Sequence, residues 1–512
     1  MGRNILFVCT DQQRFDSLGC NGGKIARTPV IDAWAKAGIN YTRAHNQNVV
    51  CMPARSTMLT GQYVRSHGVY ANGVALPEDA PSVAALLHAA GYRTALLGKA
   101  HWQPAVDPMG RWRENTMARE GFTGPYRGFE HIELAMHGAM RIRNNWHYDR
   151  WLMHAHPEGA DQFFKLFIRD ENGLRLNEQG GGDTGAPQVA INSIPREYYH
   201  TDWVADRAID WLKTLGDGEN WFCMVSFPDP HHPWDPPASE RARVNWRDLD
   251  LPEGHPGSRD KIVAILAQKP RHWLDYYTGR FNNQEGGPTG FRPCDMSDDQ
   301  VREINALVHV ENELIDEACG RIEAYLKQRG WDRDTDIFFT TDHGELQGDF
   351  GLLFKGPYHV DALMRLPMIW RPAPSAQVAP ASIGQPVGQV DLAPSFCAIA
   401  GIAAPDWMQG RPLPVSGTSH QRMLTEWDSQ FPHIDMHLRS LYRDGLVCTA
   451  YEKGGVYEGS EGELYDLAND PRQWRNLWSD PAWAQRKSDL LADLYDSLPP
   501  ARAPRLPVEA PA

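Results

Sequence analysis

Ile5-Leu6-Phe7-Val8-Cys9 is an uninterrupted apolar run near the start of the chain, and Thr10-Asp11-Gln12 follows it directly. A run of this kind is typical of a strand that is buried on both faces of a parallel sheet. Further strand-like and helix-like segments alternate along the chain. The strand-like segments are Thr94–Leu97, Trp221–Phe227 and Ile337–Phe339, and the helix-like segments are Thr28–Ala37, Ser82–Ala90, Trp203–Leu215 and Val301–Leu326. The alternation predicts an α/β fold with a large, mostly parallel sheet sandwiched by helices.

Two long stretches interrupt this alternation, near residues 104–195 and 233–295, and neither has a helical or strand period. Long non-periodic insertions in an α/β scaffold tend to carry functional loops. From about residue 410 the chain changes to short strand-like runs and turns, and it ends in a Pro-rich segment. We therefore expect a large domain over 1–409 and a smaller α+β subdomain over 410–512, with a small antiparallel sheet and a mobile tail.

The composition restricts the class of function. The chain of 512 residues has a net charge of −14 and no basic block, which disfavours nucleic acid and anionic membrane surfaces as partners. No apolar run reaches the roughly 20 residues of a membrane span, so we expect no membrane association. The eight cysteines are scattered, and the first apolar run is too short for a signal peptide. These features predict a cytoplasmic protein.

Polar side chains follow four of the predicted strands. The four endings are Thr10-Asp11-Gln12, Gly98-Lys99-Ala100-His101, Pro228-Asp229-Pro230-His231-His232 and Thr340-Thr341-Asp342-His343-Gly344. Ligands of open parallel sheets bind beyond the carboxyl ends of the strands, so we expect these side chains at one edge. Asp11, Asp342 and His343, with the amide of Gln12, suit Ca²⁺, Mg²⁺ or Mn²⁺ better than a thiolate-rich zinc site would. The alternative is an Asx-turn at Asp11 and a hydrogen-bonded loop histidine at His343.

A separate signal lies in Cys51-Met-Pro-Ala-Arg-Ser-Thr-Met-Leu-Thr-Gly61. Pro53 favours the start of a helix, and Gly61 favours its end. Cys51 then lies just before a helix N-terminus, where backbone N–H groups attract anions. Arg55, one turn later, can bind an oxyanion through paired hydrogen bonds. The pattern predicts a reactive thiol beside an anion site; the alternative is a buried structural cysteine next to a capping proline.

The helix predicted over Val301–Leu326 carries a group of titratable side chains. They are His309, Glu311, Glu313, Asp316 and Glu317. Acidic residues at helical spacing usually form a solvated face with ion pairs one turn apart. We therefore expect these side chains to be exposed.

The segment Cys51–Gly61, read as Cys-x-Pro-x-Arg followed by Leu-Thr-Gly, closely resembles the signature of the type I sulfatases, a family of the alkaline phosphatase superfamily whose cysteine is converted to formylglycine. The resemblance runs over nearly the whole chain. It includes Thr10-Asp11-Gln12, Gly98-Lys99-Ala100-His101, Pro230-His231, Thr341-Asp342-His343-Gly344-Glu345, Lys355, Glu463-Leu-Tyr-Asp-Leu467, Asp470-Pro471 and Asn476-Leu477. Several separated motifs in the right order are more specific than the short signature alone. The resemblance implies an alkaline phosphatase-like fold and a catalytic sulfatase domain over 1–409.

The resemblance also implies a nucleophile and a metal. Cys51 would become the formylglycine, whose hydrated form is both the nucleophile and a metal ligand. The implied metal ligands are Asp11, Gln12, Cys51, Asp342 and His343, and the preferred metals are Ca²⁺ and Mn²⁺. Many sulfatases have a second acidic ligand where this chain has Gln12, so Gln12 departs from the family pattern.

The remaining roles implied by the resemblance concern the transferred group. Arg55 and Lys99 would bind the hydrated aldehyde and the sulfate, and His101 would remove a proton from the second hydroxyl. His231 and Lys355 would contact the transferred group, and either could protonate the leaving oxygen. His232 could take the place of its neighbour His231. Asn72 matches a substrate-contacting position of some relatives, or it belongs to a simple turn at Asn72-Gly73.

We expect a hydrolase of sulfate esters, because Lys99-x-His101 is the sulfatase pattern. The Asp11-Gln12 and Asp342-His343 pairs are similar to those of phosphonate monoester hydrolases, so cleavage of phosphonate monoesters or phosphodiesters at the same site is the alternative. A non-catalytic binder of sulfated or phosphorylated ligands and a metal-dependent phosphotransferase that uses the unmodified thiol are two further alternatives. The implied partners are a small sulfate or phosphonate ester and a formylglycine-generating enzyme, and homo-oligomerisation stays open.

Overall fold

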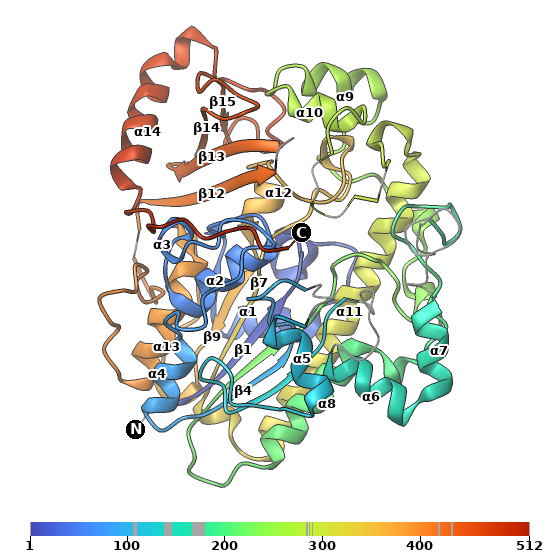
Figure 1. The fold of residues 1–512 in the computed structure, drawn as a ribbon, viewed down its shortest axis with the longest axis vertical. Coiled ribbons are helices and arrows are strands. Elements are labelled where there is room, and N and C mark those ends of the chain that lie inside the picture. Colours follow the sequence, from blue (N-terminus) through green and yellow to red (C-terminus); the bar gives the residue numbers. More distant parts are fainter. Residues whose placement is uncertain are drawn as a thin grey trace.

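The central feature of the computed structural model is an eight-stranded sheet in the order β10-β2-β9-β7-β1-β6-β4-β5 (Figure 1). In that order the strands span Ala381–Ile383, Ile39–Tyr41, Met368–Arg371, Thr335–Thr341, Asn4–Thr10, Trp221–Ser226, Arg93–Gly98 and His131–Leu134. β1 pairs in parallel with β7 and β6, and β4 pairs in parallel with β6 and β5. β9 alone among these strands runs antiparallel to its two neighbours, β7 and β2. The large, mostly parallel sheet predicted from the sequence is confirmed.

The structure describes residues 2–510 except 106–109, 138–145, 166–179, 283–284, 286, 289, 418–419 and 432–433. Within these ranges, no helix is both long and apolar enough to cross a bilayer. All eight cysteines are free.

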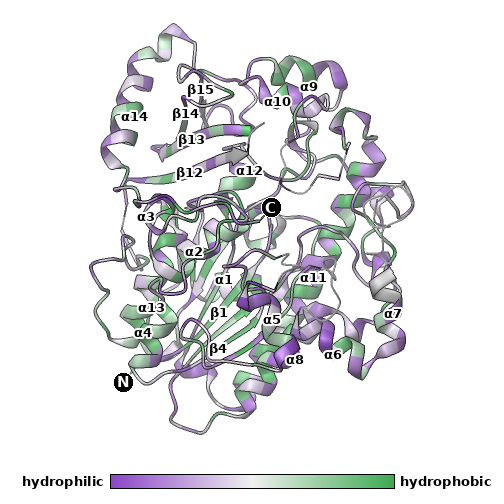
Figure 2. Cartoon of the chain, viewed as in Figure 1, coloured by the Kyte–Doolittle hydropathy of each residue, from purple (hydrophilic) through white to green (hydrophobic). Residues whose placement is uncertain are grey.

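The side chains of β1 alternate between two hydrophobic cores. Ile5, Phe7 and Cys9 belong to one core, and Leu6 and Val8 belong to the other. Figure 2 shows β1 and β4 largely in the colour of hydrophobic residues. The first core is packed against α2 (Cys51–Thr60), α4 (Val83–Ala89) and α13 (Leu392–Ala400), and the second against α1 (Pro29–Ala37), α8 (His200–Lys213) and α11 (Asp298–Gln328). The sheet is therefore sandwiched by helices, as a strand that is apolar on both faces requires.

Local sequence signals set the ends of several helices. α2 ends at Thr60, and Gly61 follows with φ of 68° and donates its N–H to Thr57 O. Only glycine adopts this left-handed conformation without a steric cost. Ser82 caps α4 through its side-chain oxygen, and Ser297 and Gln300 form a capping box at the start of α11.

The two insertions and the short connections contain the other elements of the main domain. The first insertion contains α5 (Arg113–Glu120), β5, α6 (His147–Ala155) and α7 (Pro157–Lys165), and the second contains α9 (Arg259–Leu266) and α10 (His272–Tyr277). The short elements are α3 (Val64–His67), α12 (Asp361–Met364) and a three-stranded sheet of β11 (Val387–Gly388), β3 (Ala44–His45) and β8 (Arg365–Leu366). The first insertion thus adds the edge strand β5 to the central sheet.

The C-terminal subdomain is a four-stranded antiparallel sheet with one helix. Its strands, in spatial order, are β12 (Arg422–Phe431), β13 (Ile434–Arg443), β14 (Leu446–Glu452) and β15 (Gly462–Asp466), and its helix is α14 (Ala484–Ser497). Leu490 and Leu494 of α14 pack on one face of this sheet. The other face packs against α9 and α10 of the second insertion, with Trp273 in the shared core. The predicted small α+β subdomain is confirmed.

The C-terminal segment, which we expected to be mobile, is held against the main domain. Arg502 N–H donates to Arg65 O at 2.7 Å, and Glu509 N–H donates to Gly73 O at 2.8 Å. The guanidinium of Arg505 lies 3.9 Å from the ring centre of Tyr70. Figure 1 shows the segment returning from α14 across α3 and α2. Its Pro-rich composition predicts poor order, but hydrogen bonds to distant backbone atoms hold it in place.

The acidic side chains of α11 are mostly buried, which corrects the expectation of a solvated face. Glu311, Glu313 and Asp316 are only 0%, 3% and 1% exposed. Asp316 accepts hydrogen bonds from two N–H groups at the start of α1, and Glu313 pairs with Arg27 at 2.9 Å. Asp316 and Glu313 thus satisfy groups on neighbouring elements, which the helical spacing does not reveal, whereas Glu317 is 43% exposed, as expected.

Lys269 links the second insertion to the C-terminal subdomain. Its side chain is fully buried, and Nζ lies 3.8 Å from Glu463 Oε1 and 2.8 Å from Gln473 O. Nζ also lies 4.5 Å from the ring centre of Trp273. Burial lowers the pKa of Lys269 to about 8, and Glu463 opposes this shift. Lys269 and Glu463 therefore form a buried ion pair between the second insertion and the C-terminal subdomain.

We expect Lys269→Met to lower the free energy of unfolding by about 3 kcal/mol, because it leaves the buried carboxylate of Glu463 without its cation. Urea denaturation followed by tryptophan fluorescence measures this loss. Lys453→Met is the matched control, since Lys453 is 78% exposed and its ion pair lies at the surface. Equal stability of the two variants would contradict the role of the buried pair.

Candidate active site

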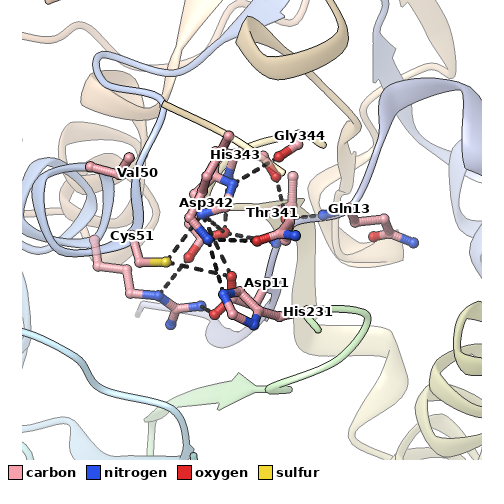
Figure 3. Close-up of polar contacts among 12 residues, drawn as sticks. Asp11, Gln13, Val50, Cys51, His231, Thr341, Asp342, His343 and Gly344 are labelled. Carbon is pink, nitrogen blue, oxygen red and sulfur yellow. Dashed lines mark hydrogen bonds and ion pairs between the residues drawn. The ribbon is translucent and has the colours of Figure 1, made fainter. Parts of the chain in front are cut away.

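The polar endings of the central strands meet at one edge of the sheet. Asp11 follows β1, Lys99 follows β4, His231 lies beyond β6, and Asp342 and His343 follow β7. α2 begins at this edge with Cys51 as its first residue, whereas the sequence predicts that Cys51 lies just before the helix. Figure 3 shows the sulfur of Cys51 directed toward His343, Asp342 and Asp11. The structure thus brings together the thiol and the polar strand ends.

Four of these residues form a compact donor set. Cys51 Sγ lies 3.1 Å from His343 Nε2 and 3.7 Å from Asp11 Oδ1. His343 Nε2 lies 3.7 Å from Asp11 Oδ1 and 3.7 Å from Asp342 Oδ1. The ligand atoms of all four residues lie within 4.8 Å of one another, and all four residues are buried.

The donor set fits a divalent cation. His343 Nδ1 donates to Gly344 O at 2.8 Å, which leaves the lone pair of Nε2 facing the two carboxylates. Two buried carboxylates that face one another repel unless a cation lies between them. Carboxylate and imidazole donors suit Mn²⁺, and carboxylates with few soft ligands suit Ca²⁺.

Arg55 holds the carboxylates of this set in place. Its Nε donates to Asp342 Oδ2 at 2.8 Å, and its Nη2 lies 3.5 Å from Asp11 Oδ2. Nη1 donates to Lys99 O at 3.0 Å and to Ser226 Oγ at 2.9 Å. The side chain has no exposed surface. Arg55 was predicted to bind sulfate, but these contacts favour a role in positioning the carboxylates.

The second oxygen of Asp11 faces a group of cations and imidazoles. Lys99 Nζ donates to Asp11 Oδ2, and His137 Nε2 lies 3.1 Å from the same oxygen. Burial by itself raises the pKa of Asp11, but the ammonium group of Lys99 brings this pKa well below its ordinary value. Asp11 therefore stays ionised.

Lys355, His231 and Gln12 form a connected group beside the donor set. Lys355 Nζ donates to His231 Nε2 at 2.9 Å and to Gln12 Oε1 at 2.6 Å. His231 Nδ1 donates to His232 O, so its Nε2 is the nitrogen that accepts from Lys355. Gln12 Nε2 donates to Glu345 Oε2 at 2.5 Å. The oxygen of Gln12 thus already accepts from an ammonium group, which competes with a metal ion for it.

The remaining histidines of the site differ in their surroundings. His232 is more deeply buried than His231, which is partly exposed, and His232 Nδ1 contacts the amide of Gln12 at 3.1 Å. His101 has φ of 61°, and its backbone N–H donates to Glu114 Oε2. Burial first, and then the charge of Lys99, lower the pKa of His101 well below its ordinary value. His101 is therefore neutral.

Asn72 connects α2 to the second insertion. Its Oδ1 accepts from Met52 N at 3.0 Å, and its Nδ2 donates to Glu285 Oε2 at 3.0 Å. Burial raises the pKa of Glu285 to about 7, and Lys355 opposes this shift. Asn72 is thus part of the site wall as well as of a turn.

The sequence reasoning missed His137 and Glu285. His137 stands three residues after β5, at the same sheet edge as the other strand endings. Reading the short β5 run as a fifth strand would have found it. Glu285 lies in a non-periodic part of the second insertion, where no local pattern marks it.

The thiol of Cys51 is not activated by this environment. Burial and the nearby carboxylate of Asp11 raise the pKa of Cys51 to about 12. In the metal-free chain the thiol is therefore almost fully protonated at neutral pH.

Comparison with known proteins gives matches over almost the whole chain. A family model described as Sulfatase matches residues 3–402, and one described as N-sulphoglucosamine sulphohydrolase, C-terminal, matches residues 348–498. The uncharacterized sulfatase YidJ of Escherichia coli (strain K12) is 26% identical over 98% of this chain and 88% of its own length. An arylsulfatase of Clostridium perfringens (strain 13 / Type A) is 25% identical over 95% of this chain and 92% of its own length. The crystal structure of a phosphonate monoester hydrolase of Agrobacterium radiobacter has the same fold, with a TM-score of 0.74 and 23% identity over 96% of this chain and 95% of that one.

We expect Asp342→Asn to weaken the binding of Ca²⁺ or Mn²⁺ by more than about a hundredfold, because loss of outer-shell partners alone costs about 10–100-fold. Isothermal titration calorimetry of chelator-treated protein measures the affinity. Asp210→Asn, on an exposed part of α8, should bind as the unmodified chain does. Unchanged affinity in Asp342→Asn would rule out this donor set as the metal site.

Proposed function

Because the chain belongs to the sulfatase family, we propose that it hydrolyses sulfate esters at this site, with a formylglycine at position 51 and one divalent cation. The observation that carries the proposal is the position of Cys51. Its Sγ lies 3.1 Å from His343 Nε2 at the start of α2, within a donor set that includes Asp11 and Asp342. Lys99 and Lys355 lie on the other side of the set, where an anion would bind.

The cation and the formylglycine would each have a distinct role at this site. Asp11, Asp342 and His343 would hold the cation, which supplies positive charge and lowers the pKa of a bound hydroxyl. A hydrated formylglycine supplies one hydroxyl as nucleophile and a second that allows release of the transferred group by elimination. The thiol itself offers no such release, which is the chemical reason for modifying Cys51.

Side chains of the site would stabilise the charge that develops in the reaction and would carry out the proton transfers. Lys99 and Lys355 would stabilise the negative charge that develops on the oxygens of the transferred group. Neutral His101 would accept the proton of the second hydroxyl. Lys355 and His231 are joined by a hydrogen bond of 2.9 Å and would act together to protonate the leaving oxygen. A formylglycine-generating enzyme is the partner that this maturation requires.

Phosphonate monoesters and phosphodiesters are the second candidate substrates. Like sulfate esters, they are monoanions with a tetrahedral centre, so the same cations would bind them. The Asp11-Gln12 pair, with the Gln12 amide held between Lys355 and Glu345, favours this candidate, because it is similar to the pair of the phosphonate monoester hydrolases. Lys99 favours sulfate esters, which gain from a further cation.

The two remaining alternatives have less support. A metal-dependent phosphotransferase with an intact thiol would lack the second hydroxyl through which a hydrated formylglycine releases the transferred group. A non-catalytic binder would not need the neutral base His101 or the Lys355–His231 pair.

We expect Cys51→Ala to abolish turnover of aryl sulfates and Cys51→Ser to retain little, because neither variant has the thiol that is converted to the aldehyde. The active protein should show, by intact-mass spectrometry, the mass loss of a thiol converted to an aldehyde, and both variants should lack it. Cys448→Ala, at a buried cysteine of the C-terminal sheet, is the control and should keep full activity. Turnover by Cys51→Ser at a rate near that of the unmodified chain would contradict the proposal.

We expect Lys99→Met to lower kcat/KM for an aryl sulfate by about 10²–10³-fold, as removal of one oxyanion donor does. The measurement compares an aryl sulfate with an aryl phosphonate monoester for both proteins, and Lys453→Met serves as a control for loss of an exposed lysine. The unmodified chain should prefer the sulfate, and this preference should shrink in Lys99→Met. If the unmodified chain prefers the phosphonate, sulfate esters are not its main substrates, and phosphonate monoesters or phosphodiesters are.

A further inference from the structure

Three imidazole rings lie in a stack beside the donor set. The ring centres of His137 and His231 are 4.0 Å apart with an angle of 18° between the planes. The ring centres of His231 and His232 are 3.9 Å apart with an angle of 28°. His231 is therefore the middle ring, and it is held on both faces.

His137 is itself firmly anchored. It is only 7% exposed, and its Nε2 lies 3.1 Å from Asp11 Oδ2 and 3.5 Å from Lys99 Nζ. It follows β5, and the backbone there is tied to the central sheet by a hydrogen bond from Ala135 N to Gly98 O at 3.1 Å. The outer ring of the stack thus belongs to the rigid sheet edge.

We infer that His137 is a positioning residue that, with His232 on the opposite face, sets the plane of the His231 ring so that His231 Nε2 stays directed at Lys355. This inference rests on the proposed function, in which the Lys355–His231 pair delivers the proton to the leaving oxygen. A ring held on both faces loses little freedom when the hydrogen bond from Lys355 forms, so the pair is ready before the ester binds. His137 would not touch the ester itself.

A second metal ion is the other use that this group of residues suggests. Asp11, His137 and His231 have ligand atoms within 4.8 Å of one another. However, Lys99 Nζ already donates to the oxygen of Asp11 that His137 contacts, and Lys355 donates to His231. Two ammonium groups beside a single shared carboxylate disfavour a further cation there, so the stack is better explained by proton delivery.

The test compares His137→Phe, which keeps an aromatic face against His231, with His137→Asn, which removes it. kcat/KM is measured for a series of aryl sulfates whose phenols range from strongly to weakly acidic. Weakly acidic phenols need protonation as they leave, so their esters report on the Lys355–His231 pair. We expect His137→Asn to lose about tenfold on the poorest leaving groups, the upper range for one aromatic contact, and less than about twofold on the best. His137→Phe should keep the dependence of the unmodified chain.

His231→Ala and the double variant His137→Asn/His231→Ala complete the design. His231→Ala should steepen the dependence on the leaving group, and adding His137→Asn should not steepen it further. His156→Asn is the control, because it removes another stacked imidazole of the first insertion, 3.5 Å from the ring of Tyr198, away from the site. Near-UV circular dichroism checks that each variant is folded.

Three results would overturn the inference. They are an equal loss over the whole series in His137→Asn, a loss in His137→Phe as large as in His137→Asn, and additive effects in the double variant. Each of these would indicate that His137 acts through Asp11 or only through folding. Failure of the unmodified chain to cleave any aryl sulfate is a different outcome, because it contradicts the proposed function. The same series of phosphonate esters would then test the stack.

Discussion

The arrangement of the site depends on one buried carboxylate, that of Asp11. A fully buried charge is tolerated only where opposite charges and hydrogen bonds surround it. Here one oxygen meets Lys99, Arg55 and His137, and the other faces Cys51 and His343. These partners lie in α2, in the first insertion and just after β4 and β7. The charge of Asp11 therefore interacts with segments that are far apart in the sequence.

The two oxygens of this carboxylate divide the site into two electrostatic halves. On one side Asp11 Oδ1 and Asp342 Oδ1 leave negative charge around the lone pair of His343 Nε2, which suits a cation. On the other side Lys99, Lys355 and the histidines provide positive charge and hydrogen-bond donors, which suit an oxyanion. Cys51 stands at the boundary, where a nucleophile would face both the cation and the group to be transferred.

The central sheet supplies the metal side, whereas the additions to the fold complete the rest. The first insertion contributes His137, and the second contributes Glu285, which is bonded to Asn72 at 3.0 Å. The second insertion is in turn fixed to the C-terminal subdomain by the buried pair of Lys269 and Glu463. The C-terminal segment also bonds to Gly73, next to Asn72. Segments outside the α/β core thus contribute side chains and backbone contacts around Asp11 and Asn72.

The sequence by itself determines the parallel sheet, the helix ends at Gly61 and Ser82, and the polar residues that follow β1, β4, β6 and β7, because each depends on a short pattern of burial or capping. The motif at Cys51 and the strand endings therefore predict most of the site. Only the tertiary structure shows that Arg55 contacts Asp342 and Asp11, that Gln12 is bonded to Lys355, and that Glu311, Glu313 and Asp316 of α11 are buried. It alone also brings His137, Glu285 and the C-terminal segment to the site. The physical reason is that periodicity reports which face of an element is buried, whereas the partner of a buried polar group depends on how segments far apart in the chain pack together.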